Sequence, residues 1–375
     1  MPTYKRWPVE FLSGEGVWLR DSSGDRYLDL MAGIAVASVG HCHPKVTAAI
    51  SYQAASLVHV SNLYLTRPQA ELAGRLSNMT GGMKVFFGNS GAEAVECAIK
   101  LARRWGDAKR TIVATEKGFH GRTLGALAAT GQPDKQAPFE PLPLGFVHVP
   151  FDDPGALERA LDGTVAAVII EAIQGEAGVI VPSPGYLKDV RALCDDAGAL
   201  LIIDEIQTGL ARTGRHFAYE HEGARPDILC LGKALAGGLP MGACLARPEV
   251  ADSFQVGDHG STFGGGPVPS AAALAVLDVI EEEGLCDRAA SGGERLMKGL
   301  SAIAPEGSVV RGKGLMIGLE LPDGGARAVA GACLERKVLV NDIGDRVIRF
   351  VPPLVISDEE IDQGLSVLEE VFDAI

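Results

Sequence analysis

Seven short, continuous apolar runs separated by helix-forming stretches constrain the fold of this chain more than any other feature. The helix-forming stretches include residues 90–105, 154–162 and 185–197. Apolar runs without polar alternation are typical of strands covered on both faces, and repeated strand–helix–strand order favours a parallel sheet. We therefore expect an α/β fold with a mainly parallel, seven-stranded sheet built from KVFF (84–87), TIVAT (111–115), FVHVP (146–150), AAVIIEA (166–172), ALLIIDE (199–205), DILCLG (227–232) and GACLA (242–246).

The two ends of the chain follow different patterns. Residues 16–33 contain two alternating runs around Ser22-Ser23-Gly24, which predicts a hairpin, and residues 270–284 predict a long helix. The glycine-rich sequence Ser291-Gly292-Gly293 predicts a linker after that helix, and the rest of the chain predicts a smaller α+β domain. We expect three parts: an N-terminal segment (1–40) that packs with the small domain, a large domain (41–270), and a linking helix with the small C-terminal domain (271–375).

Charge and cysteine content limit the partners and the compartment. The chain has 34 basic and 48 acidic residues, a formal net charge of −14, which argues against nucleic acid and anionic membranes as partners. The N-terminus lacks the apolar core of a signal peptide, and no apolar run reaches the roughly 18 residues of a membrane helix. The seven cysteines form no C-x-x-C pair, so we expect free thiols and a cytoplasmic location.

Two charged residues stand at the ends of apolar runs, where burial is costly. Asp204 ends the run at 199–205, and Lys233 follows the run at 227–232. A buried carboxylate needs a cation or hydrogen bonds, and a buried amine needs a partner or a reaction. Each residue also has a simpler interpretation: Asp204 caps the next turn, and Lys233 extends its ammonium to water.

Two further groups follow strands of the same predicted sheet. Ser90 is the N-cap of a helix in a capping-box pattern, and the amides of Gly91 and Ala92 after it could hold an anion. Phe119 and Arg122, in EKGFHGRT (116–123), offer an aromatic face and a carboxylate-binding fork. The simpler interpretations are a well-capped helix and an aromatic residue that serves packing.

All four groups are expected at one edge of the sheet, because ligands of open α/β sheets bind at the carboxyl ends of the strands. Together they offer a phosphate cradle, a ring to stack, a carboxylate for a ring nitrogen and an amine. Pyridoxal 5′-phosphate requires all four, with the lysine bound to it as a Schiff base and the aspartate on its pyridinium nitrogen. The sequence therefore predicts a site for this cofactor at Lys233 and Asp204.

Five motifs in the same order resemble those of the class III (subgroup II) aminotransferases of pyridoxal-phosphate fold type I. They are SGAEA, FHGRT, IIDEIQTGLARTG, LGKALAGGLP and STFGG, and the resemblance extends from LDLMAGIAV to RFVPPL. It implies a large domain with a seven-stranded sheet and a smaller C-terminal domain. It further implies a homodimer with shared sites, in which Thr262 reaches the phosphate of the neighbouring subunit. The implied cofactor-binding residues are Ser90, Gly91, Ala92, Phe119, Asp204, Gln207, Lys233 and Thr262, with Lys233 and Asp204 catalytic.

The substrate residues are also implied by the resemblance. Arg349 matches the arginine that holds the α-carboxylate of glutamate or 2-oxoglutarate, and Glu176 matches the glutamate that neutralises it when an ω-amine donor is bound. Arg122 matches the residue that binds the far carboxylate of N-acetylornithine. Without the motif, Arg349 and Glu176 could be an ordinary surface ion pair.

The implied reaction transfers the terminal amino group of N2-acetyl-L-ornithine to 2-oxoglutarate, giving N-acetyl-L-glutamate 5-semialdehyde and L-glutamate, a step of arginine biosynthesis. Ile34 stands where ornithine aminotransferases carry a tyrosine that binds a free α-amino group, which favours an acylated donor. Ala37 and Gly266 replace asparagines that are usual in the family, so other ω-amine donors stay open. These are N-succinylornithine, ornithine, 4-aminobutyrate and lysine-pathway amines.

Other classes of protein fit less well. A non-catalytic pyridoxal-phosphate regulator would bring a DNA-binding segment, and there is no room for a basic helix-turn-helix before Gly33. A nicotinamide dehydrogenase would open a helix with G-x-G-x-x-G after the first strand, a motif that this chain lacks. The sequence His41-Cys42-His43 has no further ligands nearby, so we expect a structural loop and no metal site.

Overall fold

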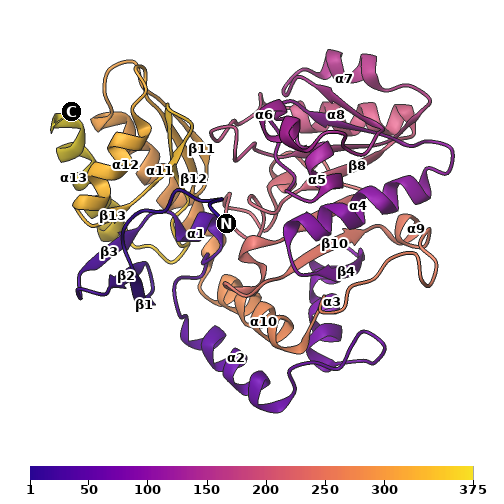
Figure 1. Cartoon of the computed structure of the whole chain (residues 1–375), viewed down its shortest axis with the longest axis horizontal. Helices are drawn as coiled ribbons and strands as arrows, with labels where there is room; N and C mark the ends of the chain where they lie inside the picture. The colour runs from indigo at the N-terminus through magenta and orange to yellow at the C-terminus, as the bar shows by residue number, and fades with distance from the viewer. Residues whose placement is uncertain (375) are drawn as a thin grey trace.

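A seven-stranded sheet lies at the centre of the larger part of the molecule, which a computed structural model describes for residues 1–374 (Figure 1). The strand order is β4-β10-β9-β8-β7-β5-β6, and every strand runs parallel to its neighbours except β10, which is antiparallel to both β4 and β9. The sequence prediction of the sheet is confirmed. The strands are β4 (Lys84–Gly88), β5 (Thr111–Thr115), β6 (Phe146–Val149), β7 (Val165–Glu171), β8 (Leu200–Asp204), β9 (Ile228–Leu231) and β10 (Gly242–Ala246).

Both faces of this sheet are buried, which explains the continuous apolar runs. On β8, Leu200 and Ile202 pack into a cluster with α4 (Gly91–Trp105) and α5 (Leu124–Ala129). The alternate residues Leu201 and Ile203 pack with α7 (Pro154–Ala160), α8 (Tyr186–Ala197) and α10 (Pro267–Glu282) on the opposite face. A strand with two covered faces has no solvent-facing positions for polar side chains.

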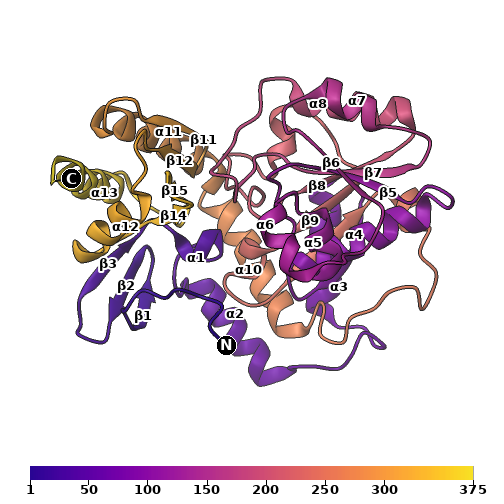
Figure 2. The same cartoon turned by 45° about the horizontal axis from the view of Figure 1, so that its top comes forward.

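Three helices of the larger part pack together, as Figure 2 shows. The helix α10 packs against α2 (Pro44–Ser56) and α3 (Arg67–Met79), although more than 180 residues separate it from α3 in the chain. The short helix α6 (Pro133–Gln136) lies between β5 and β6, and the short helix α9 (Pro248–Ala251) follows β10. Among the described helices, none combines the length and the apolar character that crossing a membrane requires.

The smaller part combines the C-terminal domain with the N-terminal strands (Figure 1). Its antiparallel sheet has the order β11-β12-β15-β14, and α11 and α13 pack together beside it. The predicted N-terminal hairpin is formed by β2 and β3, and β3 pairs in parallel with β13. The elements are β1 (Phe11–Glu15), β2 (Trp18–Asp21), β3 (Arg26–Asp29), α1 (Ala32–Ala35), α11 (Leu285–Ile303), β11 (Val309–Lys313), β12 (Met316–Glu320), α12 (Ala326–Glu335), β13 (Val338–Leu339), β14 (Asn341–Ile343), β15 (Val347–Phe350) and α13 (Asp358–Ala374).

The prediction of a glycine-rich linker at 291–293 was wrong, because α11 continues through these residues. The glycines serve close packing here. A Cβ atom on Gly293 would lie 2.1 Å from the carbonyl oxygen of Gly314, whereas one on Gly292 would have its nearest contact at 3.4 Å, with Ile361. The glycine at 293 is therefore required by the backbone that crosses α11, a contact that the local sequence does not reveal.

This contact predicts opposite effects for two neighbouring substitutions. Gly293→Ala should destabilise the protein by about 1–3 kcal/mol, because its methyl group overlaps backbone that cannot rotate away. Gly292→Ala should be neutral or stabilising by up to about 1 kcal/mol, since alanine favours a helix and its methyl group has room. The midpoint of thermal unfolding measures both variants. Equal midpoints for the two would contradict the packing explanation.

Candidate active site

Loops at the carboxyl ends of β4, β5, β7, β8 and β9 converge on one cavity of about 270 Å³. This edge is where ligands bind in open α/β sheets, because the strands there feed separate loops into a shared space. Most of the residues predicted from the sequence line this cavity. The lining residues are Gly91, Ala92, Phe119, His120, Gly121, Arg122, Glu171, Glu176, Asp204, Ile206, Gln207 and Lys233.

The N-terminus of α4 supplies one end of the cavity. The Ser90 hydroxyl accepts a hydrogen bond from the amide of Glu93 (3.2 Å), as the capping-box pattern predicts. The Glu93 carboxylate turns back one residue further than expected and accepts from the amide of Asn89 (2.8 Å). The amides of Gly91 and Ala92 occupy the first turn, where a helix provides no acceptors, so they can donate to an anion.

Asp204 is buried at the end of β8 and shares its carboxylate between two donors. Its Oδ2 lies 2.8 Å from Nδ1 of His120, and its Oδ1 accepts from the amide of Ile206 at 3.0 Å. Burial lowers the pKa of His120, but its hydrogen bond to Asp204 and the charges of Asp204 and Glu171 outweigh burial and raise it. The pair therefore favours the protonated form of His120 beside the buried carboxylate.

Glu171 is the register partner of Asp204 on the neighbouring strand β7. It accepts hydrogen bonds from the amides of Phe119 (2.9 Å) and Gly175 (3.1 Å), so it fixes the loop that carries the aromatic ring. Burial, with a smaller contribution from the charge of Asp204, raises the pKa of Glu171 to about 7 against the opposing effects of His120 and of the two backbone hydrogen bonds. Glu171 thus holds the Phe119 loop in place against the sheet edge.

Lys233 begins the short turn after β9 with a positive φ of 40°. A non-glycine residue in this region costs on the order of 1–3 kcal/mol, which the surrounding packing must supply. Burial and the charge of Arg349 lower the pKa of Lys233 to about 8, against the opposing charges of Glu176, Glu171 and Asp204. A large share of this amine is therefore neutral and nucleophilic near physiological pH.

Arg349 on β15 brings the small domain to the cavity. Its side chain is only 1% exposed, and its Nε and one terminal nitrogen donate to Oδ1 of Asn341 at 3.0 and 2.5 Å. The other terminal nitrogen donates to Glu176 at 2.6 Å and to Gln207 at 3.1 Å. Burial raises the pKa of Glu176, but the charge of Arg349 outweighs it and lowers the pKa. Asn341 and Gln207 thus hold the guanidinium in one orientation, and Glu176 neutralises its charge. An incoming carboxylate could replace Glu176.

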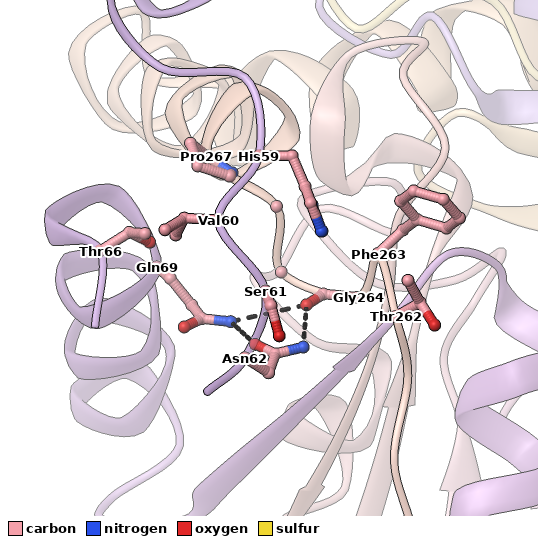
Figure 3. Close-up of a pocket in the computed structure, with 12 residues that line it drawn as sticks. His59, Val60, Ser61, Asn62, Thr66, Gln69, Thr262, Phe263, Gly264 and Pro267 are labelled. Carbon is pink, nitrogen blue, oxygen red and sulfur yellow. Dashed lines mark hydrogen bonds between the residues drawn. The ribbon is translucent and has the colours of Figure 1, made fainter. Parts of the chain in front are cut away.

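The remaining predicted residues lie at the rim or elsewhere. Arg122 is exposed, with its Cζ 5.5 Å from the centroid of the Phe119 ring. Thr262 is exposed in a different depression, beside His59 and Phe263 (Figure 3). The three other substrate-related positions are not among the residues that line the cavity. Ile34, with a φ of 64°, and Ala37 lie in the N-terminal segment after β3, and Gly266 caps the start of α10.

The donor set fits pyridoxal 5′-phosphate. The carboxylate oxygens of Asp204 each accept one hydrogen bond, which leaves lone pairs for a ring N–H. The Lys233 amine, the Phe119 ring and the amides of Gly91 and Ala92 border the same cavity. A Cβ on Gly91 would lie 2.7 Å from Ile206, so only glycine allows the helix to start this close to the cavity wall.

Three residues of the site were missed by sequence reasoning. Glu171 ends an apolar run just as Asp204 does, so the same argument applied to the run at 166–172 would have found it. His120 stands directly after Phe119 at the same sheet edge, but its pairing with Asp204 depends on the strand order. Nothing in the sequence around Asn341 indicates a role in the site, because its contact with Arg349 depends on the pairing of β14 with β15.

Comparison with known proteins places the whole chain in one family. The model of the family Aminotransferase class-III matches residues 2–372. The chain is 50% identical to the acetylornithine aminotransferase of Methanopyrus kandleri, over 100% of this chain and 97% of that protein. It also resembles the crystal structure of acetylornithine aminotransferase from Elizabethkingia anophelis (TM-score 0.91, 37% identity, 100% and 96% covered). A structure of ornithine aminotransferase from Toxoplasma gondii, with partial occupancy of pyridoxal phosphate at its active site, matches with a TM-score of 0.96 (38% identity, 100% and 92% covered).

The lowered pKa of Lys233 predicts its reactivity in the cofactor-free protein. Its acetylation rate should rise through a midpoint near pH 8, because the neutral amine becomes the main form above that pH. Competitive acetylation followed by mass spectrometry measures this midpoint, with the exposed Lys188 as the internal reference. In Arg349→Met the midpoint should move upward, since a repelling cation is gone. A Lys233 midpoint near that of an unperturbed lysine, about 10.4, would contradict the burial argument.

Proposed function

The chain belongs to the class-III aminotransferases, and on that premise we propose that it transfers the terminal amino group of N2-acetyl-L-ornithine to 2-oxoglutarate. The products are then N-acetyl-L-glutamate 5-semialdehyde and L-glutamate. The observation that carries the proposal is the arrangement around one cavity: the Lys233 amine and the Asp204 carboxylate line it, and the Arg349 guanidinium faces Glu176 beside it. A nucleophilic amine and a carboxylate-binding fork in one cavity suit amino-group exchange between two amino acids.

In this proposal the cofactor is pyridoxal 5′-phosphate, held covalently by Lys233. Asp204 would accept a hydrogen bond from its ring nitrogen, Phe119 would stack on its ring, and Gln207 would approach its phenolic oxygen. Ser90, Gly91 and Ala92 hold its phosphate, where the helix dipole of α4 favours negative charge. When bound, the cofactor supplies an electron-withdrawing ring that takes up the electron pair left after the substrate carbon loses its proton.

Lys233 moves that proton once the substrate amine has taken its place. A pKa of about 8 suits a general base and acid at physiological pH, because both forms of the amine are then populated. The hydrogen bond from His120 holds the Asp204 carboxylate in one orientation. The pair therefore fixes where the ring nitrogen can bind and keeps its proton in place.

Arg349 and Glu176 allow one cavity to take two kinds of substrate. With 2-oxoglutarate or glutamate, the α-carboxylate takes the guanidinium of Arg349 as its bidentate partner. With a donor whose reacting amine is remote from its carboxylate, Glu176 stays on Arg349 and cancels its charge. Gln207 and Asn341 keep the guanidinium in the same position in both states, because both accept from it through neutral oxygens.

The choice of N-acetylornithine rests on the relatives and on the charges at the rim. The curated relatives at up to 50% identity, including that of Methanopyrus kandleri, are acetylornithine aminotransferases. Arg122 is available to bind the donor's carboxylate, and the aliphatic Ile34 suits an acylated α-nitrogen. Ornithine, N-succinylornithine, 4-aminobutyrate and lysine-pathway amines would share every cofactor contact and differ only at the rim.

The proposal includes a homodimer in which Thr262 reaches the phosphate of the neighbouring subunit. In support, Thr262 lies in a loop bordered by exposed apolar side chains, namely Leu63, Tyr64, Leu65 and Phe263. The segment 59–62 and the loop 261–264 are held together by Asn62. Its Nδ2 donates to the carbonyl of Gly264 (Figure 3) and to that of Ser261, both at 3.0 Å. An exposed apolar patch of this kind is typical of a covered interface.

A half-reaction tests the proposed substrate. The cofactor-loaded protein, without any keto acid, is mixed separately with N-acetylornithine, ornithine and 4-aminobutyrate, and the cofactor absorbance is followed. Conversion should be fast with N-acetylornithine and slow with the other two, because only N-acetylornithine combines a carboxylate at the rim with an uncharged α-nitrogen. Fast conversion with ornithine or 4-aminobutyrate alone would keep the aminotransferase activity and reject the substrate.

A further inference from the structure

Lys135 is held rigidly beside the cavity although no step of the proposed reaction uses it. It lies on the short helix α6, which two glutamines fasten to its surroundings. Gln136 donates to the carbonyls of Leu127 (3.0 Å) and Thr130 (2.8 Å), and Gln132 donates to that of Lys117 (2.9 Å). The Lys135 ammonium donates to the side-chain oxygen of the same Gln132. These hydrogen bonds hold the flexible side chain of Lys135 in one position.

That position faces the Phe119 ring and two charged groups. The Lys135 Nζ lies 5.6 Å from the centroid of the ring, and the Cζ of Arg122 lies 5.5 Å from the same centroid. Partial burial lowers the pKa of Lys135, the charge of Glu176 raises it, and the charge of Arg122 lowers it again. Two neighbouring cations repel each other, so their arrangement at a half-buried site costs stability unless an anion joins them.

Two carboxylates act on Lys135: that of Glu176, which Arg349 already binds at 2.6 Å, and that of its chain neighbour Asp134, whose side chain is exposed to solvent. A substrate carboxylate is therefore the natural third member of the group. We propose that Lys135 is a substrate-binding residue that, together with Arg122, binds the donor carboxylate remote from the reacting amine. Arginine supplies a planar fork and lysine a point charge, a combination that holds one carboxylate from two sides.

This assignment rests on the proposed function and adds a basis for its specificity. A donor with a free α-amino group would bring an ammonium next to two cations, whereas an acylated nitrogen is neutral. Like-charge juxtaposition is an effective way to reject a wrong ligand. Lys135 and Arg122 thus favour acylated ω-amino acids with an anionic far end over free ornithine and over diamines.

The test compares two donors that differ only in the carboxylate. N-acetylornithine and N-acetyl-1,4-diaminobutane have the same reacting amine and the same amide, but the second lacks the carboxylate. In Lys135→Met, the half-saturating concentration of N-acetylornithine should rise about tenfold, the size of one charge-assisted hydrogen bond. The maximal half-reaction rate should stay within about twofold, since the reacting centre is untouched.

Two controls separate binding from structure. The half-saturating concentration of N-acetyl-1,4-diaminobutane should be the same for the native protein and for Lys135→Met. The Lys135→Arg variant should restore most of the affinity for N-acetylornithine. Equal losses with both donors would assign Lys135 a structural role beside Phe119 and overturn the proposal. An unchanged half-saturating concentration of N-acetylornithine would overturn the proposal as well. So would a loss of affinity confined to the 2-oxoglutarate half-reaction, because Lys135 would then act through Glu176 and not on the donor.

Failure of the proposed function would look different. In that case the native protein would not convert N-acetylornithine, and the comparison is repeated with 4-aminobutyrate, which also carries a far carboxylate, against 1-aminobutane. A carboxylate-specific loss in Lys135→Met still supports the role of Lys135, and its absence still rejects it.

Discussion

A carboxylate buried at the end of a sheet strand must be compensated, and the compensation of Asp204 organises the whole site. Its oxygens accept from His120 at 2.8 Å and from the amide of Ile206 at 3.0 Å, two residues in the segments that follow β5 and β8. His120 belongs to the loop after β5, two strands away, so the ion pair ties that loop to β8 across β7. Glu171 on β7 then fixes the amide of Phe119 in the same loop. The cavity therefore has its shape before any ligand enters.

The second buried charge links the two parts of the molecule. Arg349 belongs to the small domain, and its partner Glu176 follows β7 of the large one. Burying an arginine without compensation would be costly, so Glu176, Gln207 and Asn341 together stabilise it where it lies. The consequence for function is that the carboxylate-binding group and the nucleophilic amine of Lys233 are positioned relative to each other by the fold.

Much of this architecture could be predicted from the sequence, because the strands are covered on both faces and read as unbroken apolar runs. The charged residues that end such runs, Asp204 and Lys233, stood out for the same reason. The glycines at 292 and 293 show the opposite case, since they looked like a linker and lie inside α11. The glycine at 293 is required by Gly314, which lies 21 residues further along the chain and approaches it only in the folded protein. His120 and Asn341 escaped notice for a similar reason, because pairing between distant elements creates their partners.

The central claim is that Lys233 is the residue to which the cofactor is joined. Borohydride reduction of the cofactor-loaded protein makes that bond permanent, and peptide mapping by mass spectrometry locates it. The account predicts the added mass on the peptide that contains Lys233, and its loss in a Lys233→Ala variant that keeps its fold. Cofactor mass on another lysine of the native protein, such as Lys135 beside the same cavity, would contradict the account.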